Sequence, residues 1–152
     1  MDVQGCLACD LTAGRLPLPG GCIHETEHWI VEHCVGPLGV GALVVKPRRH
    51  VVAVGELTGA EAAELGPLLA RTAAVVDELV QPEQVYVGLW SHAGRVRVHI
   101  HFVVQPATTE AIDVVGAYGP GLATGMFERG EQPDAAAVEA FSDQARAVFD
   151  PP

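Results

Sequence analysis

The stretch 95–105 constrains the fold of this chain more than any other, because polar and apolar residues alternate along most of it. One parity holds two arginines and two histidines, namely Arg95, Arg97, His99 and His101, and the other holds Val96, Val98, Ile100, Phe102 and Val104. Successive side chains of a strand point to opposite faces. The pattern therefore predicts one strand with an apolar face on a core and an opposite face that carries two imidazoles.

Two histidines on one face of a strand lie close together and project in the same direction. Such a pair can bind an anion, ligate a metal or act as a nucleophile. The alternative is a pair of polar residues on a solvated strand face, and alternation alone does not separate these interpretations.

Length and composition favour a single domain over residues 1–152. Of the 152 residues, 49% are hydrophobic, which is enough for one core. No apolar run is long enough to span a bilayer, and the chain does not begin with a basic region followed by an apolar one. We therefore expect a soluble, cytoplasmic protein without a membrane partner, in which four cysteines are not expected to form structural disulfides.

The charge of the chain argues against general binding to nucleic acid. The formal net charge is −10, whereas such binding requires a basic surface. The few basic residues are clustered, however: Lys46, Arg48 and Arg49 form one group, and Arg95 and Arg97 another. Positive charge gathered beside histidines predicts a local anion site. For Arg48 and Arg49, a solvated turn remains the alternative.

Cys6 and Cys9 form a Cys-x-x-Cys motif, which we expect on a short loop. This spacing lets two thiolates share one zinc ion, although the motif by itself is half a site. The alternatives are a redox pair or inert reduced cysteines. The βαβ pattern that accompanies a thioredoxin-like motif is missing.

The remaining pattern predicts alternating strands and two helices. We expect strands at 22–25, 28–35, 40–45 and 85–90, with a turn at 91–94 that joins the last of them to the histidine strand as a hairpin. A long helix is expected at 57–80 and a second one at 135–149. The order predicts an α+β domain with a largely antiparallel sheet.

Three local signals refine these elements. Thr58 and Glu61 form a capping box at the start of the long helix, and Gly66-Pro67 predicts a kink or a break within it. The glycine-rich segment 107–129 has no clear period, so we interpret it as an ordered flap, a partner-contacting extension or a plain surface loop.

Together these motifs resemble the histidine triad superfamily. The resemblance rests on the Cys-x-x-Cys motif, on Leu-Val-Val-Lys-Pro-Arg-Arg-His at 43–50 and on Val-His-Ile-His-Phe-Val at 98–103, in that order and at suitable separation. It covers a core of about residues 4–106 and leaves 107–152 as a C-terminal extension. The resemblance implies a histidine-triad-like α+β fold and, as is usual in this family, a homodimer in which the sheets and long helices meet across a two-fold axis.

The resemblance also implies a reaction at phosphorus. Members of the family hydrolyse or transfer nucleoside monophosphates through a covalent nucleotidyl-histidine intermediate. The middle histidine of a His-x-His-x-His pattern is the nucleophile that attacks the α-phosphate. Matched to this pattern, His99 is the middle position and His101 the third, and the first position is Arg97. A neutral imidazole is a competent nucleophile, and a second one can donate a hydrogen bond to developing charge.

In zinc-bearing members the first histidine of the pattern is one of four metal ligands. The resemblance assigns the other three to Cys6, Cys9 and His50, and arginine cannot ligate a metal. We therefore expect either a zinc site with an unknown fourth ligand, with Cys34 and His92 as possible substitutes, or a vestigial site. A site with three protein ligands is open and suits catalytic zinc.

Other expected contacts are to the substrate. The family commonly holds the ribose with an aspartate, at a position occupied here by Cys34, and strand parity favours Glu32 over His33 as its replacement. We also expect Ser91 and Arg97 to contact substrate, with Arg97 on a phosphate. The main hypothesis is a nucleotide hydrolase or nucleotidyltransferase. The alternatives are a divergent protein of the histidine triad fold with an altered substrate, or a non-catalytic nucleotide- or zinc-binding protein of that fold.

Overall fold

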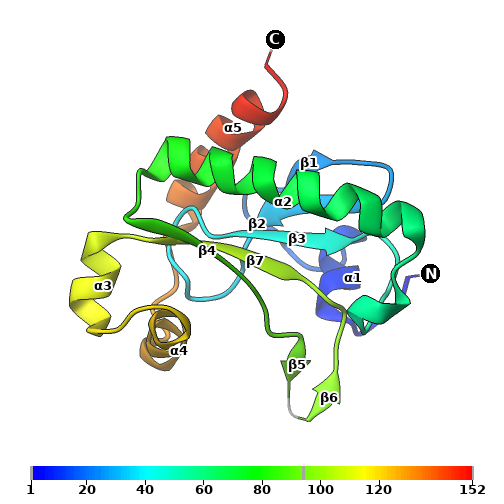
Figure 1. The fold of residues 1–152 in the computed structure, drawn as a ribbon, viewed down its shortest axis with the longest axis horizontal. Helices are drawn as coiled ribbons and strands as arrows, with labels where there is room; N and C mark the ends of the chain where they lie inside the picture. The colour runs from blue at the N-terminus through cyan, green and yellow to red at the C-terminus, as the bar shows by residue number, and fades with distance from the viewer. Residues whose placement is uncertain (1, 94, 152) are drawn as a thin grey trace.

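The computed structural model describes residues 2–93 and 95–151, and its architecture is α+β (Figure 1). A five-stranded sheet has the order β1-β2-β3-β7-β4, and each neighbouring pair in it is antiparallel. Its strands are β1 (Cys22–Glu25), β2 (Trp29–His33), β3 (Leu43–Pro47), β4 (Gln84–Leu89) and β7 (Phe102–Ala107). Two short strands, β5 (His92–Ala93) and β6 (Val96–Arg97), form a separate hairpin. The predicted fold class is thus confirmed. Gly94, the last residue of the predicted turn, lies outside the described residues.

Helices lie on both faces of the sheet (Figure 1). The helices α2 (Gly59–Val80) and α5 (Ala135–Phe149) cover one face. The helix α4 (Pro120–Arg129) packs against the other face, with α3 (Thr109–Val115) beside it. The short helices α1 (Leu7–Thr12) and η1 (Val54–Glu56) precede β1 and follow β3 in the chain. Among the described residues, no helix is both long enough and apolar enough to cross a bilayer.

The main core lies between the sheet and the helices α2 and α5. Trp29 and Val45 of the sheet pack there with Val76 of α2 and with Phe149 of α5, and each of these side chains is fully buried. Burial of a large apolar side chain stabilises a fold by roughly 1.5–3 kcal/mol. Because Phe149 belongs to this core, the C-terminal segment packs as part of the same folded unit.

The long helix α2 begins as the sequence predicts. The Thr58 hydroxyl accepts a hydrogen bond from the backbone N–H of Glu61, and the Glu61 carboxylate accepts one from the backbone N–H of Thr58. The predicted break at Pro67 is wrong, because the helix continues to Val80. An internal proline costs about 3 kcal/mol. The buried side chains of Leu68 and Val76 beyond it offset this cost.

The histidine stretch is not one regular strand, and this corrects the first expectation. The pairing of β6 ends at Arg97, and β7 begins at Phe102. Between them the backbone N–H of Ile100 donates to the carbonyl of Val51 instead of to a neighbouring strand of the sheet. Strict alternation therefore does not hold here, and the two histidines enter different surroundings.

The glycine-rich segment 107–129 contains two helices that the sequence pattern did not predict. Thr108 caps α3 by accepting a hydrogen bond from the N–H of Ala111, and Gly116 ends this helix with a φ of +72°. Each helix is short and buries few side chains, mainly Ile112 in α3 and Leu122 in α4. A clear period cannot develop over so few turns.

The buried carboxylate of Glu61 predicts how stability depends on pH. Hydrogen bonds from Arg49 lower the pKa of Glu61 from its usual 4.5 to about 2, and burial acts in the opposite direction. Its contribution is therefore complete above pH 4.5 and is lost as the pH falls toward 2. We expect Glu61→Gln to lower the free energy of unfolding by about 2 kcal/mol at pH 7. Urea denaturation should show this difference shrinking below pH 4.5.

The matched control is Glu78→Gln, because Glu78 is an exposed glutamate of the same helix. It should change the free energy of unfolding by less than about 0.5 kcal/mol at either pH. A Glu61→Gln difference that stays constant down to pH 2.5 would contradict the assignment.

Candidate functional site

Two cysteines and two histidines converge at one end of the sheet. The ligand atoms of Cys6, Cys9, His50 and His99 all lie within 4.8 Å of one another. The Cys9 Sγ is 3.4 Å from His50 Nδ1 and 3.5 Å from His99 Nδ1. The Cys-x-x-Cys motif lies at the start of helix α1, with Cys6 as the N-cap, and not on the predicted loop.

The orientation of His99 is fixed from both sides of its ring. Its Nε2 lies 2.9 Å from the carbonyl oxygen of Pro47, so Nε2 carries the hydrogen and donates it. The lone pair on Nδ1 then faces the Cys9 sulfur. Burial lowers the pKa of His99 to about 4, and the His99 side chain is 3% exposed. A metal-binding histidine typically donates its second ring nitrogen to a carbonyl in this way.

The positions of the four side chains are compatible with a tetrahedral metal ion. Zinc bonds of about 2.3 Å to sulfur and 2.0–2.1 Å to nitrogen imply sulfur-to-nitrogen separations of roughly 3.5 Å around a tetrahedron. The two separations at Cys9 match this value. Two thiolates and two imidazoles are also a donor set that suits zinc.

The structure therefore brings Cys6, Cys9 and His50 together and adds His99 as a fourth member. The two substitutes considered from the sequence lie elsewhere. Cys34 accepts a hydrogen bond from the N–H of Gly36, and His92 is exposed in β5.

His101 faces a different space from His99. It lines a cleft of about 560 Å³ between α4 and the strands β4 and β7. The lining residues are Leu38, Gln84, Val85, Tyr86, Val87, Gly88, Trp90, His101, Val103, Gln105, Gly119, Pro120, Ala123 and Phe127. His101 is the one histidine of this set, and the lone pair of an imidazole nitrogen can act as a nucleophile.

Main-chain and hydroxyl groups hold the His101 ring in place. Its Nδ1 lies 3.1 Å from the carbonyl oxygen of His99 and 3.4 Å from the Ser91 hydroxyl. The Ser91 hydroxyl in turn accepts a hydrogen bond of 3.0 Å from the backbone N–H of His101. A carbonyl can only accept, so Nδ1 carries the hydrogen and Nε2 keeps its lone pair. Ser91, expected at the substrate, thus contacts His101 directly.

Two other predicted substrate contacts have different surroundings. Glu32 is 3% exposed, and its carboxylate accepts a hydrogen bond of 2.6 Å from the Lys46 ammonium. The carboxylate expected at the ribose is thus held in an internal ion pair. Arg97 is exposed in β6 and is not among the residues that line the His101 cleft.

The predicted cluster of Lys46, Arg48 and Arg49 does not form an anion site. Each of these cations pairs with a carboxylate instead: Lys46 with Glu32, Arg48 with Glu25 and Arg49 with Glu61. Neighbouring side chains of a strand point to different faces and reach different partners. The three cations that are close in sequence therefore do not form one positively charged surface.

Lys46 is a structural residue of the site that the sequence pattern did not identify. It is 1% exposed, and its ammonium also donates 2.9 Å to the carbonyl oxygen of Ala8, which lies within the Cys-x-x-Cys motif. Burial raises the pKa of Glu32, and the charge of Lys46 opposes this effect. The pair ties the helix α1 to the sheet. The only sequence signal was a lysine within an otherwise apolar strand.

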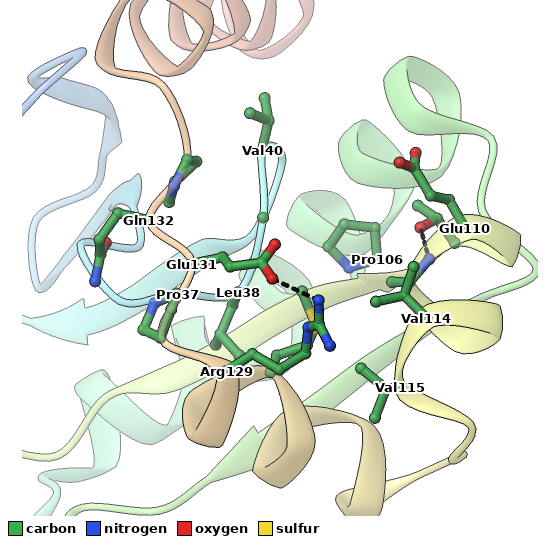
Figure 2. A pocket seen from close by; sticks show the side chains of 15 residues that line it. Pro37, Leu38, Val40, Pro106, Glu110, Val114, Val115, Arg129, Glu131 and Gln132 are labelled. Atoms are coloured by element: carbon green, nitrogen blue, oxygen red, sulfur yellow. Dashed lines mark hydrogen bonds and ion pairs between the residues drawn. The ribbon is translucent and has the colours of Figure 1, made fainter.

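A second cleft, of about 440 Å³, lies between the β2–β3 turn, α3 and the end of α4 (Figure 2). Pro37 and Val40 come from the turn, and the Arg129 guanidinium is hydrogen-bonded to the Glu131 carboxylate. Its lining includes neither histidine nor cysteine. It therefore offers no nucleophile or metal ligand comparable to those of the His101 cleft.

Comparison with solved structures identifies the fold. A Hit-like protein involved in cell-cycle regulation from Bartonella henselae, with an unknown ligand, superposes with a TM-score of 0.72 at 15% identity over 96% of this chain and 97% of that one. A zinc-bound histidine triad family protein from Mycobacterium smegmatis gives 0.68 at 20% identity over 95% and 93%. A hypothetical histidine triad nucleotide-binding protein from Sulfolobus tokodaii gives 0.68 at 17% identity over 95% and 91%. The chain has the histidine triad fold. No protein-family model and no curated protein matches its sequence.

The Lys46–Glu32 pair of this histidine triad fold makes a prediction about stability. Lys46→Met leaves the Glu32 carboxylate buried without its cation, so we expect the free energy of unfolding to fall by about 3–5 kcal/mol. Adding Glu32→Gln to that variant should restore part of the loss, because it removes the buried charge. Urea denaturation of the single and double variants measures both effects.

Arg48→Met is the matched control for Lys46→Met. It breaks an ion pair of the same length, 2.6 Å, whose side chains are 44% and 60% exposed. The cost should be below about 1 kcal/mol. Equal costs for Lys46→Met and Arg48→Met would show that burial of the Lys46 pair has no special importance.

Proposed function

We propose that this protein is a nucleotide hydrolase or nucleotidyltransferase with His101 as the nucleophile. The observation that carries the proposal is the placement of His101 in the cleft, with Nδ1 held by the carbonyl of His99 and Nε2 left with its lone pair. The His-x-His-x-His pattern then begins at His99 and ends at Val103. His99 takes the position of the metal ligand, and His101 takes the middle, nucleophilic position.

The reaction follows from the state of the His101 ring. Nε2 attacks the α-phosphorus, a P–N bond forms, and the bond from phosphorus to the leaving group breaks with its electron pair. The imidazolium that results keeps its Nδ1 hydrogen bond to the carbonyl of His99, which stabilises the new positive charge. Water or another acceptor then attacks phosphorus and loses its proton to solvent, and the P–N bond breaks with its electron pair returning to Nε2.

We further propose that Cys6, Cys9, His50 and His99 hold a structural zinc ion. A site with four protein ligands is closed, whereas catalytic zinc keeps a position open for water. When bound, the ion crosslinks α1, the segment after β3 and the segment before β7. His99 supplies the carbonyl that holds His101, so the metal site supports the geometry of the nucleophile.

A second candidate is a non-catalytic nucleotide- or zinc-binding protein. It is favoured by Val103, which stands at the third position of the pattern and cannot donate a hydrogen bond to a phosphate. The absence of lysine and arginine from the residues lining the cleft points in the same direction. An enzyme with an altered substrate of little negative charge would also agree with Val103 at the third position and with a cleft lining without lysine or arginine.

The remaining proposals concern assembly and location. We propose a homodimer, since β4 lies at the edge of the sheet and offers its free backbone groups to a second copy. A monomer in light scattering at micromolar concentration would contradict this.

We propose a cytoplasmic location because the four cysteines of the described structure are free thiols, and zinc binding requires reduced cysteines.

Metal removal should destabilise the protein. We expect purified protein to contain about one zinc ion per chain and its Tm to fall by several degrees on treatment with a chelator. Metal analysis and calorimetry measure this. Cys9→Ser and His99→Ala should lose the metal and the chelator effect, whereas Cys22→Ser, at an exposed cysteine outside the cluster, should keep both. A His99→Ala variant with full zinc content would contradict the assignment.

Turnover should depend on His101. We expect His101→Ala to lower the hydrolysis of adenosine and guanosine phosphoramidates or dinucleoside polyphosphates by about 10³-fold or more, with its zinc content unchanged. His92→Ala, at an exposed histidine, is the matched control and should retain activity. Unchanged turnover in His101→Ala would refute the assignment of the nucleophile. No turnover by the folded wild-type protein would favour the binding candidate.

A further inference from the structure

We infer that Glu27, His28 and Glu64 form a second metal site, which takes a divalent first-row transition ion such as Mn²⁺ or Zn²⁺. One ligand atom of each residue lies within 4.8 Å of those of the other two. The site shares no residue with the cysteine–histidine cluster or with the His101 cleft. The inference therefore goes beyond the proposed function and does not depend on it.

The site joins two parts of the chain that are far apart in sequence. Glu27 and His28 occupy the turn between β1 and β2, and Glu64 lies in the second turn of α2. The Nδ1 of His28 is 2.5 Å from the Oε1 of Glu64. Donor atoms with bonds of 2.0–2.2 Å to one ion lie about 3–4.4 Å apart. Small rotations of these side chains, none of which is buried, thus bring three donors onto one ion.

The carboxylate of Glu64 is held in position by Thr26. The Thr26 hydroxyl donates a hydrogen bond of 2.6 Å to the Oε2 of Glu64 and accepts one of 3.0 Å from the backbone N–H of Trp29. The other oxygen, Oε1, then faces the ring of His28. Outer groups of this kind orient the ligands of metal sites.

The turn that carries Glu27 and His28 is itself fixed to its neighbours. The carbonyl of His28 accepts a hydrogen bond of 2.8 Å from the backbone N–H of Arg48 after β3. The indole N–H of Trp29 donates 2.9 Å to the carbonyl of Glu61, one turn before Glu64 in α2. Turn and helix thus have a set separation without an ion, which lowers the ordering cost of binding one.

The charges around the three donors favour a cation. Across residues 2–93 and 95–151, Glu64 is paired with His28, and no lysine or arginine pairs with Glu64 or Glu27. The two arginines nearest in sequence are paired with other carboxylates. Two carboxylates beside one imidazole leave an excess of negative charge even when that ring is protonated. A divalent cation neutralises this excess.

The donor set also selects the class of ion. One imidazole with two carboxylates suits a first-row transition ion, whereas Ca²⁺ and Mg²⁺ prefer a shell of oxygen alone. Three protein donors leave further positions to water, so we expect an exchangeable ion here and not the closed coordination of the cysteine–histidine cluster. The hydrogen between His28 and Glu64 passes to solvent when the ion enters.

Titration with manganese chloride tests the inference without turnover. Electron paramagnetic resonance of the free ion measures how much Mn²⁺ the purified protein binds, and wild type should bind one ion per chain at this site. Glu27→Gln, at an exposed side chain, should weaken this binding by about tenfold or more. Glu78→Gln, at an exposed glutamate elsewhere in α2, is the matched control and should bind as wild type does. Excess Mg²⁺ at equal concentration should not displace the Mn²⁺.

A second measurement locates the ion. Paramagnetic Mn²⁺ broadens nearby amide signals in nuclear magnetic resonance spectra, and those of residues 26–29 and Glu64 should broaden first. Cys9→Ser should leave this pattern unchanged, which separates the site from the cysteine–histidine cluster.

Equal Mn²⁺ binding by wild type and Glu27→Gln, displacement by equal Mg²⁺, or broadening confined to the surroundings of Cys9 would overturn the inference. Absence of nucleotide turnover with retained, Glu27-dependent Mn²⁺ binding would overturn the proposed function and keep the inference.

Discussion

The hydrogen bond from His99 Nε2 to the carbonyl of Pro47 is the interaction on which the site depends. It turns the lone pair of Nδ1 toward Cys9 and so assigns the ring to the cysteine–histidine cluster. The same main-chain segment presents the carbonyl of His99 to the ring of His101. One short, irregular segment between two strands therefore sets the orientation of both histidines, and the two rings have different surroundings.

The buried Lys46–Glu32 pair connects the sheet to the N-terminal helix α1. The Lys46 ammonium donates to Glu32 within the sheet and to the carbonyl of Ala8 within the Cys-x-x-Cys motif. Two buried charges are costly unless both are paired and hydrogen-bonded. The arrangement meets that condition, and its geometry links α1 to the same strand that supplies Pro47. These hydrogen bonds connect the cysteine–histidine cluster to the sheet.

The cleft beside His101 shows what the C-terminal segment contributes. Helix α4 forms one wall of the cleft, and a hydrogen bond from the backbone N–H of Gly119 to the Tyr86 hydroxyl connects the start of this helix to β4. The segment adds no charged side chain to the lining. It gives this histidine triad fold a cleft that is lined by apolar, aromatic and neutral polar side chains together with His101.

The sequence by itself determined the secondary elements with strong local signals and the sheet they form, because strand alternation, the Thr58–Glu61 capping box and the α2 and α5 periods are encoded over short spans. It also marked the two histidines as candidate site residues. Only the tertiary structure decided their surroundings. Alternation placed His99 and His101 on one face, but the hydrogen bond from Ile100 to Val51 ends the regular pairing there and separates them. Contacts between residues distant in sequence, such as His99 with Cys9 or Lys46 with Ala8, leave no local period from which they can be read.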